Sequence, residues 1–448
     1  MRPHLRLYHM GWWKKIKAWH IALAVVASCG IGGLGASWFV TYRAKNEVQA
    51  AKARLHTLGY PVSTDELVQN IPDDQNAGPL YRQASEYVHA MKIKEGNFLI
   101  PQTNEVDYDA MAAYVKAMET TMGMVERAAQ QPECYFSRPW KNGWRVLFPE
   151  FADFKRYVKV TSYRARLATR NHDYRAALKA NALGLRIAQQ ADEPFLIGLL
   201  VGVACQAIVL AELDKEIVAF GDIPEFRQEA MRLLDGLPPL PAISRAFSYE
   251  IPLQVTMFDQ LGGPTFWKDM YGNENPSGWI KYYSRFEFIR QSALAKCLTW
   301  QADALEKMKA APNNWHLADQ ALDEMDRKQT TDQSLAAKVV QFVSPSFTQI
   351  GQAVGRLDAN RQLARTALML YDYKAKNGKF PTLIPPNFPA DPFGKGPFVY
   401  DRSGNRFFLY SVGPNGRDNG GKPIYASNQH VPSGASSDDV EFMVARPE

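Results

Sequence analysis

One uncharged run near the start of the sequence constrains the fold more than any other feature. The segment from Trp19 to Tyr42, WHIALAVVASCGIGGLGASWFVTY, contains no Asp, Glu, Lys or Arg. As a helix rising about 1.5 Å per residue, it is long enough to cross a hydrocarbon core roughly 30 Å thick. Aromatic side chains, which favour the headgroup region, stand at both of its ends: Trp12, Trp13, Trp19, Trp38 and Tyr42. We therefore predict a single transmembrane helix over residues 18–42.

The charges that flank this helix predict its orientation. Residues 1–17 contain five basic residues and no acidic one, whereas the segment after Tyr42 mixes both signs. By the positive-inside rule, residues 1–17 form a cytoplasmic basic tail, and the bulk of the chain is periplasmic, outside the inner membrane. Without those five, 47 of the 52 Lys and Arg residues remain against 46 Asp and Glu. A body this close to neutral gives no electrostatic argument for binding nucleic acid.

Small residues inside the predicted span have competing interpretations. Ser28, Gly32 and Ala36 recur at every fourth position, and such a stripe lets two membrane helices approach closely, which makes it a candidate dimer face. Gly30, Gly32 and Gly35 also satisfy the GxGxxG pattern of dinucleotide-binding turns. A dinucleotide site also needs further strand–helix units and an acidic residue that binds the ribose. A polar helix follows the glycines instead, which favours the interpretation as a packing stripe.

A lipoprotein interpretation competes with the anchor. The tetrapeptide that ends in Cys29 resembles a bacterial lipoprotein processing box, in which the cysteine is lipidated. Apolar sequence continues well beyond Cys29, whereas a processed lipoprotein normally turns polar at once, so we expect an uncleaved anchor. The other three cysteines form no CxxC pair, which argues against a zinc ribbon or a disulfide scaffold.

The next part of the chain has helical periodicity. Residues 43–240 are predicted to form a helical body, and residues 241–343 a second helical segment after the proline-rich turn near Pro238. Apolar residues recur at three- and four-residue spacing, as on the buried side of a helix. They are Met111, Tyr114, Val115, Met118, Met122 and Val125, and then Phe151, Phe154, Tyr157 and Val158.

One helical hairpin in the body has a recognisable pattern. Residues 163–169 precede the turn Arg170–Asp173, and Tyr174-Arg175-Ala176-Ala177-Leu178 then opens a second helix. This pattern resembles the helix-turn-helix repeats of tetratricopeptide type, although it covers little more than one unit. The resemblance implies a helical-hairpin stack that presents a surface to a protein partner; an all-helical domain without a groove is the alternative.

A second apolar run needs its own interpretation. Residues from Phe195 to Ala211 carry no charge, and the run is long enough to raise the question of a second membrane span. Gln206 interrupts it, and the nearest charges, Asp192, Glu193 and Glu212, are all acidic. We therefore expect a fully buried helix of the globular body.

After Ser344 the sequence changes character, with more glycine, proline and short strand signals. A helix is predicted over Asp358–Lys376, followed by Asn377-Gly378-Lys379-Phe380-Pro381, the turn Asp391-Pro392-Phe393-Gly394, strand-like residues, and the loop Tyr410-Ser411-Val412-Gly413-Pro414-Asn415-Gly416. This order resembles the soluble part of the major pseudopilin of type II secretion systems, the protein G family. The resemblance implies a small α+β module over residues 344–448. The processing site of that family is absent before Trp19, so polymerisation into a pseudopilus is not expected.

The same resemblance implies a calcium site. In the family this loop and a later aspartate hold the ion, which suits oxygen ligands. Carried over by motif, the candidate metal ligands are the carbonyl of Val412, the side chains of Asn415 and Asp418, and the late acids Asp438 and Asp439. Asn415 stands where the family has Asp, which removes one charge from the site.

Signatures of the common enzyme classes are absent from the sequence. There is no GxSxG, HExxH, P-loop or kinase motif, and the eight histidines are dispersed. Glu250 is a candidate buried acid without an identifiable partner. The sequence favours a membrane-anchored envelope scaffold or adaptor that binds proteins through its helical body. An accessory of a type II secretion or pilus-like assembly, and an envelope hydrolase with an unrecognised carboxylate site, remain the alternatives.

Overall fold

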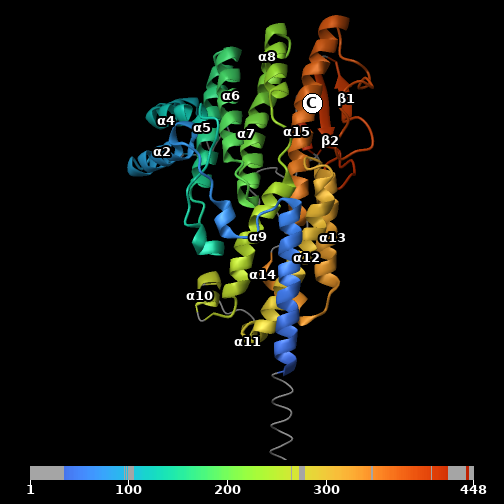
Figure 1. Ribbon diagram of the computed structural model, residues 1–448. Helices are drawn as coiled ribbons and strands as arrows, with labels where there is room; N and C mark the ends of the chain where they lie inside the picture. Colours follow the sequence, from blue (N-terminus) through green and yellow to red (C-terminus); the bar gives the residue numbers. More distant parts are fainter. Residues whose placement is uncertain are drawn as a thin grey trace, which may run out of the picture. The chain divides into compact units, whose positions relative to one another are not determined.

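A computed structural model describes residues 35–94, 96, 98, 105–263, 265–271, 278–344, 347–404, 406–421 and 440–442. Helices account for most of these residues, and a small sheet lies within residues 399–442 (Figure 1). The predicted mainly α class is therefore confirmed. The chain divides into two compact units: the first comprises Met1–Gly59, Val255–Ala302 and Lys328–Pro345, and the second Tyr60–Gln254, Asp303–Arg327 and Ser346–Glu448.

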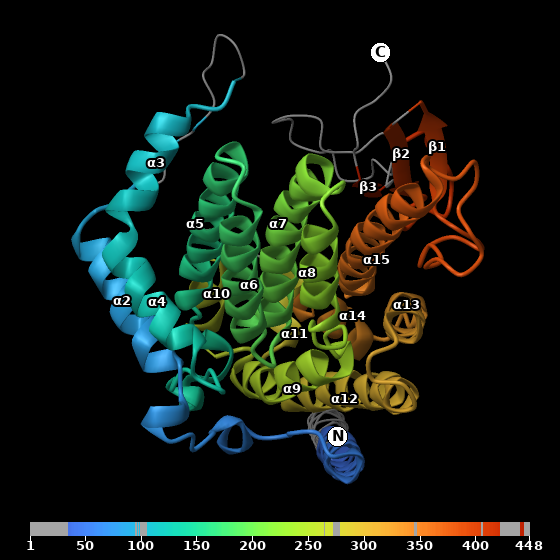
Figure 2. The same ribbon diagram turned by 90° about the horizontal axis from the view of Figure 1, so that it is seen from above.

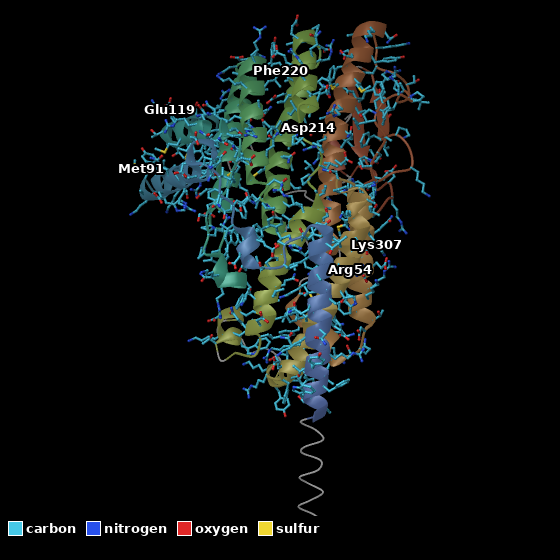
Figure 3. The ribbon with its side chains drawn as sticks, viewed as in Figure 1. Arg54, Met91, Glu119, Asp214, Phe220 and Lys307 are labelled. Atoms are coloured by element: carbon cyan, nitrogen blue, oxygen red, sulfur yellow. The ribbon has the colours of Figure 1, made fainter. Side chains whose placement is uncertain are left out.

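Residues 35–58 form one helix of the first unit, which passes Arg54 without a break (Figure 3). Its beginning exposes large apolar side chains, with 69 % of Trp38, 60 % of Phe39 and 55 % of Tyr42 accessible. From residue 44 onward, side chains at four- and three-residue spacing are buried: Ala44, Val48, Ala51 and Leu55. Lys45 Nζ lies 2.6 Å from Glu287 Oε1. One helix thus joins an exposed aromatic end to a segment packed in the first unit.

Several sequence-based predictions for the N-terminal region fall outside the described residues. These are the basic tail 1–17 and the part of the predicted span 18–42 up to residue 34, which includes Ser28, Cys29 and Gly32. The last eight residues of the predicted span, 35–42, are described and helical. Ala36, the third residue of the candidate dimer stripe, is exposed.

The remainder of the first unit consists of short helices and parts of longer ones. The short helices are α10 (Phe266–Tyr271), α11 (Gly278–Tyr283) and α14 (Leu335–Val343). The longer helices α9 (Ile243–Gln260), α12 (Glu287–Lys309) and α13 (Trp315–Thr331) each contribute residues to both units. Gly262, with φ of +88°, would place a β-carbon 2.4 Å from the carbonyl oxygen of Ser284. The turn after α9 therefore requires glycine.

The second unit begins with three short 3-10 helices and three α-helices. They are η1 (Thr64–Leu67), η2 (Asp73–Gln75), α2 (Gly78–Ala90), α3 (Tyr108–Ala117), α4 (Glu119–Ala129) and η3 (Trp140–Arg145). The predicted methionine-rich stripe is divided between α3 and α4, because the helix breaks at Met118. Met111, Tyr114, Met118, Met122 and Val125 are buried as expected, and Val115 is half-buried.

Successive hairpins form the centre of this unit. Figures 1 and 2 show α5 (Glu150–Arg170), α6 (Tyr174–Ala191), α7 (Leu196–Phe220) and α8 (Pro224–Asp235) side by side in chain order. Asp173 starts α6 by accepting the Ala176 N–H at 3.0 Å, as a capping side chain does. A β-carbon on Gly184 would lie 2.5 Å from Thr161 Oγ1, so α5 and α6 approach too closely there for any larger residue.

Helix α7 contains the apolar run predicted to be buried. Among the described residues it is the one helix whose length and composition would allow it to cross a membrane, and 61 % of its most apolar window is buried. It packs against α5, α6 and the C-terminal helix α15 (Thr348–Asn377). The expectation of a fully buried helix was wrong in one respect: Ile197 and Leu200 are 45 % and 40 % exposed, because these neighbours leave one side of α7 uncovered.

The C-terminal segment combines α15 with a three-stranded antiparallel sheet. The strands β1 (Val399–Ser403), β2 (Arg406–Ser411) and β3 (Val440–Phe442) lie in the order β1-β2-β3, and Val399 pairs with Tyr410. Helix α15 begins ten residues before the predicted helix and ends at Gly378, which has φ of +76°. It packs against α7 and α8, and Arg361 donates to the Pro238 carbonyl at 2.8 Å.

Candidate functional site

The loop predicted to hold calcium is organised by an aspartate. Asp391, in the turn before the sheet, is 3 % exposed. Its Oδ1 accepts the Ser411 hydroxyl at 2.6 Å and the Phe393 N–H at 3.0 Å, and its Oδ2 accepts the Val412 N–H at 2.9 Å. The sequence indicated a turn at Asp391; the structure shows that its carboxylate joins this turn to the loop that follows β2.

The candidate calcium ligands are only partly described. Asn415 Oδ1 accepts the Arg417 N–H, and Asp418 Oδ1 accepts the Tyr410 hydroxyl at 2.7 Å and the Gly420 N–H at 2.8 Å. Val412, Asn415 and Asp418 thus lie in one loop, whereas the late acids Asp438 and Asp439 lie outside the described residues. In the part of the chain that the structure describes, no group of three or more His, Cys, Asp or Glu residues could hold a metal ion.

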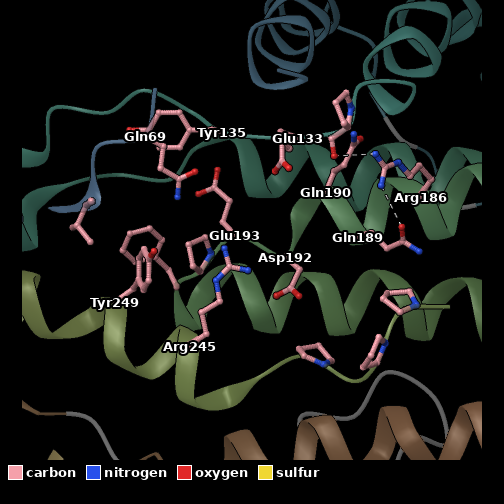
Figure 4. A pocket seen from close by; sticks show the side chains of 18 of the residues that line it. Gln69, Glu133, Tyr135, Arg186, Gln189, Gln190, Asp192, Glu193, Arg245 and Tyr249 are labelled. Atoms are coloured by element: carbon pink, nitrogen blue, oxygen red, sulfur yellow. Dashed lines mark hydrogen bonds between the residues drawn. The ribbon is translucent and has the colours of Figure 1, made fainter. Parts of the chain in front are cut away.

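A polar cavity of about 300 Å³ lies elsewhere in the second unit. Its walls come from the segment before η3, from the end of α6 and its turn into α7, from the proline-rich segment after α8, and from the start of α9 (Figure 4). The charged residues among those that line it are Glu133, Arg186, Asp192, Glu193 and Arg245. Aromatic rings form another part of the wall: Tyr135, Trp140, Phe195 and Tyr249.

A buried arginine supports one wall of this cavity. The Arg138 side chain is 3 % exposed; Nη1 lies 2.7 Å from Glu193 Oε2, and Nη2 lies 3.2 Å from Glu150 Oε2. Its guanidinium also lies near several aromatic rings, as in cation–π contacts: Phe148 at 4.6 Å, Phe136 at 5.2 Å and Trp140 at 5.8 Å. Burial raises the pKa of Glu193 to about 7, and Arg138 acts against this shift. Arg138 therefore fixes Glu193 in the wall.

Two opposite charges in the cavity are not paired with each other. Burial raises the pKa of Asp192 to about 6, and the charge of Arg245 opposes that rise. Among the described residues, neither the Asp192 carboxylate nor the Arg245 guanidinium has an ion pair or a side-chain hydrogen bond. Figure 4 shows both side chains in the cavity, with Glu133 extending into it from the segment before η3.

Other lining residues have structural partners. Arg186 donates to the Ala129 carbonyl at 3.0 Å and to the Gln131 carbonyl at 2.6 Å. Gln190 accepts the Tyr81 hydroxyl at 2.6 Å. Glu250, the candidate buried acid, accepts the Leu196 N–H at 3.0 Å, and burial raises its pKa to about 7. The sequence did not indicate this partner of Glu250, a backbone N–H in the first turn of α7 that has no acceptor within the helix.

No local motif indicates this cavity in the sequence. Asp192 and Glu193 stand out there only as acids beside an apolar helix, and Glu133 and Arg245 belong to segments far away in the chain. The residues come together because α6 and α7 are antiparallel and their connecting turn meets the start of α9. The one available signal was the acidic pair Asp192-Glu193 between two helices of low charge.

Comparison with protein-family models, with curated proteins and with solved structures finds no match to this chain. The resemblances to the pseudopilin module and to tetratricopeptide hairpins therefore stay predictions, which rest on the motifs quoted above.

Proposed function

We propose that the protein is a single-pass scaffold of the bacterial cell envelope, anchored in the inner membrane, which binds a protein partner through its helical body. The anchor is the predicted span 18–42, and the bulk of the chain is periplasmic. Support for the anchor comes from the helix over residues 35–58. Its exposed Trp38 and Tyr42 have the amphipathic aromatic character of a membrane interface, and Phe39 adds an exposed apolar ring. The same helix continues into the packed first unit.

The observation that carries the scaffold function is the uncovered side of α7. The apolar residues at three- and four-residue spacing on this side are Ile197, Leu200, Ala204, Ala207 and Ala211, and Val218 lies seven residues further on, past the exposed Lys215. Together these six apolar residues are here called the α7 stripe. The large ones are 39–45 % exposed. Contiguous exposed apolar surface marks interaction sites, and a stripe with this period matches the apolar side of a partner helix. We therefore place the partner on the α7 stripe.

The C-terminal segment is proposed to be a pseudopilin-like module that binds calcium weakly. Support comes from the order of its elements: a long helix, an Asp391 turn, antiparallel strands and a glycine-rich loop. Helix α15 packs against α7 and α8, so the module is expected to stiffen the helical body. Docking of this module into a secretion or pilus-like assembly is the second candidate function, on the strength of the same order of elements.

The test is capture of partners from detergent-solubilised membranes with two matched variants. Leu200→Glu places a charge in the α7 stripe, and Leu383→Glu places one on an apolar residue of the C-terminal segment that is 78 % exposed. We expect a protein that copurifies with wild type and with Leu383→Glu but is lost with Leu200→Glu. Equal capture by all three chains would contradict binding at the α7 stripe. Loss of secretion components with Leu383→Glu alone would favour the second function.

Topology is tested separately. Reporter fusions after Leu237 and at Glu448 are both expected to be periplasmic, because the predicted anchor precedes both positions. Extraction of the full chain by alkaline carbonate would contradict the anchor. A periplasmic signal after Leu237 with a cytoplasmic signal at Glu448 would contradict the single-pass topology.

A further inference from the structure

The cavity at the α6–α7 turn has the size and composition of a site for a small polar molecule. Its volume of about 300 Å³ lies at the lower end of the range for ligand sites. Such sites combine apolar walls with a few polar groups that orient the ligand. Here Trp140 stacks against Phe195 at 5.2 Å, Tyr249 meets Phe195 edge-on at 5.7 Å, and charged side chains lie on the same cavity.

From the arrangement of its charges, we propose that this cavity binds a zwitterionic amino compound, a free amino acid or a short peptide. The Asp192 carboxylate would receive the α-ammonium group, and the Arg245 guanidinium would receive the carboxylate. Both side chains line the cavity, and the charge of Arg245 acts on Asp192. Among the described residues, neither side chain forms an ion pair or a side-chain hydrogen bond. A ligand with both charges can therefore satisfy the two groups at once, which a purely cationic or anionic ligand cannot do.

The remaining charges favour one kind of side chain. The lining contains three acids, Glu133, Asp192 and Glu193, and two bases, Arg186 and Arg245. Glu193 is bound to Arg138, and Arg186 donates to backbone carbonyls. Glu133 is an exposed acid of the lining that forms no ion pair among the described residues. Lysine or arginine, whose side chains carry a second positive charge, should bind more tightly than leucine or glutamate.

The structure also explains why such a ligand would be held firmly. Burial of Asp192 disfavours its charged form, as the raised pKa shows. An ammonium group at hydrogen-bond distance compensates for that cost. Removal of either protein charge takes away one hydrogen bond to a charged group and should weaken binding about 10- to 100-fold.

The experiment uses the full chain in detergent micelles and isothermal titration calorimetry. The probes are L-lysine, L-leucine, L-glutamate, Nα-acetyl-L-lysine, L-lysine amide, and the dipeptides lysylglycine and glycyllysine. The variants are Asp192→Asn and Arg245→Gln, with Glu225→Gln as the control, since Glu225 is an exposed acid on α8 and does not line the cavity. Far-UV circular dichroism checks that each variant is folded.

We expect lysine to bind wild type and Glu225→Gln equally and to bind Asp192→Asn and Arg245→Gln at least about tenfold more weakly. Nα-acetyl-lysine lacks the α-ammonium group and keeps only the ε-ammonium group, so it should bind wild type and Asp192→Asn alike. Lysine amide should likewise not distinguish wild type from Arg245→Gln. Tighter binding of a dipeptide than of lysine would identify a peptide terminus as the source of the zwitterion, and the reverse order a free amino acid.

Three results would overturn the proposal. They are the absence of binding of every probe at millimolar concentration, a loss of lysine affinity in Glu225→Gln as large as in Asp192→Asn, and equal affinity of wild type for lysine and its two blocked derivatives. The last comparison needs no variant, so it decides the matter even if a substitution unfolds the chain. Partner capture through the α7 stripe is a separate measurement, and its failure would leave this proposal unaffected.

Discussion

Replacement of Glu216 by glutamine should stabilise the protein at alkaline pH. Glu216 is a fully buried residue of α7. Figure 3 labels two other residues of this helix, Asp214 and Phe220. The Asn181 amide Nδ2 lies 2.8 Å from both of its carboxylate oxygens, while the buried Asn181 Oδ1 has no hydrogen-bond partner among the described residues. Burial raises the pKa of Glu216 from 4.5 to about 8. A glutamine keeps one acceptor for Asn181 and adds a donor for its unpartnered oxygen.

The sign and size of the effect follow from proton linkage. Between pH 4.5 and about 8 the folded chain holds a proton at Glu216 that the unfolded chain has lost. The contribution of Glu216 to the free energy of unfolding therefore falls as the pH rises through this window and is constant at higher pH. A pKa unit corresponds to about 1.36 kcal/mol, so the total loss is on the order of 3–5 kcal/mol. Glu216→Gln removes this loss, whereas below pH 4.5 the two chains should be almost equally stable.

The assay is urea unfolding followed by far-UV circular dichroism, at pH 5 and pH 9 in the same detergent. We expect the free energy of unfolding of Glu216→Gln to exceed that of wild type by several kcal/mol at pH 9 and by less than about 1 kcal/mol at pH 5. Glu225→Gln, an exposed carboxylate, should change it by about 0.5 kcal/mol or less at either pH. Equal destabilisation of Glu216→Gln at both pH values would refute the reasoning, since it would show that the charge itself is needed.

Other predictions concern packing and the C-terminal loop. Gly184→Ala should lower the free energy of unfolding by about 1–3 kcal/mol, because its β-carbon would clash with α5 and α7. In Gly123→Ala the new β-carbon meets no atom within 4 Å, so this change should raise the free energy of unfolding by up to about 1 kcal/mol. Urea unfolding measures both. Asp391→Asn should cost about 1–3 kcal/mol, because one buried oxygen of Asp391 becomes a donor facing N–H and O–H groups, and hydrogen exchange should show earlier opening of the loop after β2. Millimolar calcium should raise the melting temperature of the full chain, and magnesium should do so less. The double change of Asp438 and Asp439 to Asn should abolish that calcium effect, and identical wild-type melting in calcium and in chelator would contradict the site.

The helical elements were predictable because their signals are local. The spacing of Phe151, Phe154, Tyr157 and Val158 predicts the buried side of α5, and all four are buried. The acids beside the apolar run predicted a helix of the globular body, but hydropathy alone did not show that α7 has neighbours on only some of its sides. The break at Met118 was also missed, because the apolar period continues through it.

The cavity was not predictable for a different reason. Three of its charged residues, Glu133, Asp192 and Arg245, lie on three segments, and their presence on one cavity depends on how a helix turn meets α9. The Asp391 turn was visible as a motif, but its hydrogen bonds to Ser411 and Val412 depend on where β2 ends. Local spacing carries no information about contacts of this kind between distant segments.

The unbroken helix over residues 35–58 has a mechanical consequence. Because Trp38 and Tyr42 share a helix with the buried Ala44 and Leu55, the angle between the aromatic end and the packed side is set by the number of residues between them. One inserted residue after Tyr42 would rotate that end by about 100° and displace it by about 1.5 Å. Insertion of seven residues, close to two full turns, would nearly restore the angle while it lengthened the helix by about 10 Å. The first unit would therefore keep a defined azimuth relative to the exposed aromatic end of the helix, as a flexible tether would not allow.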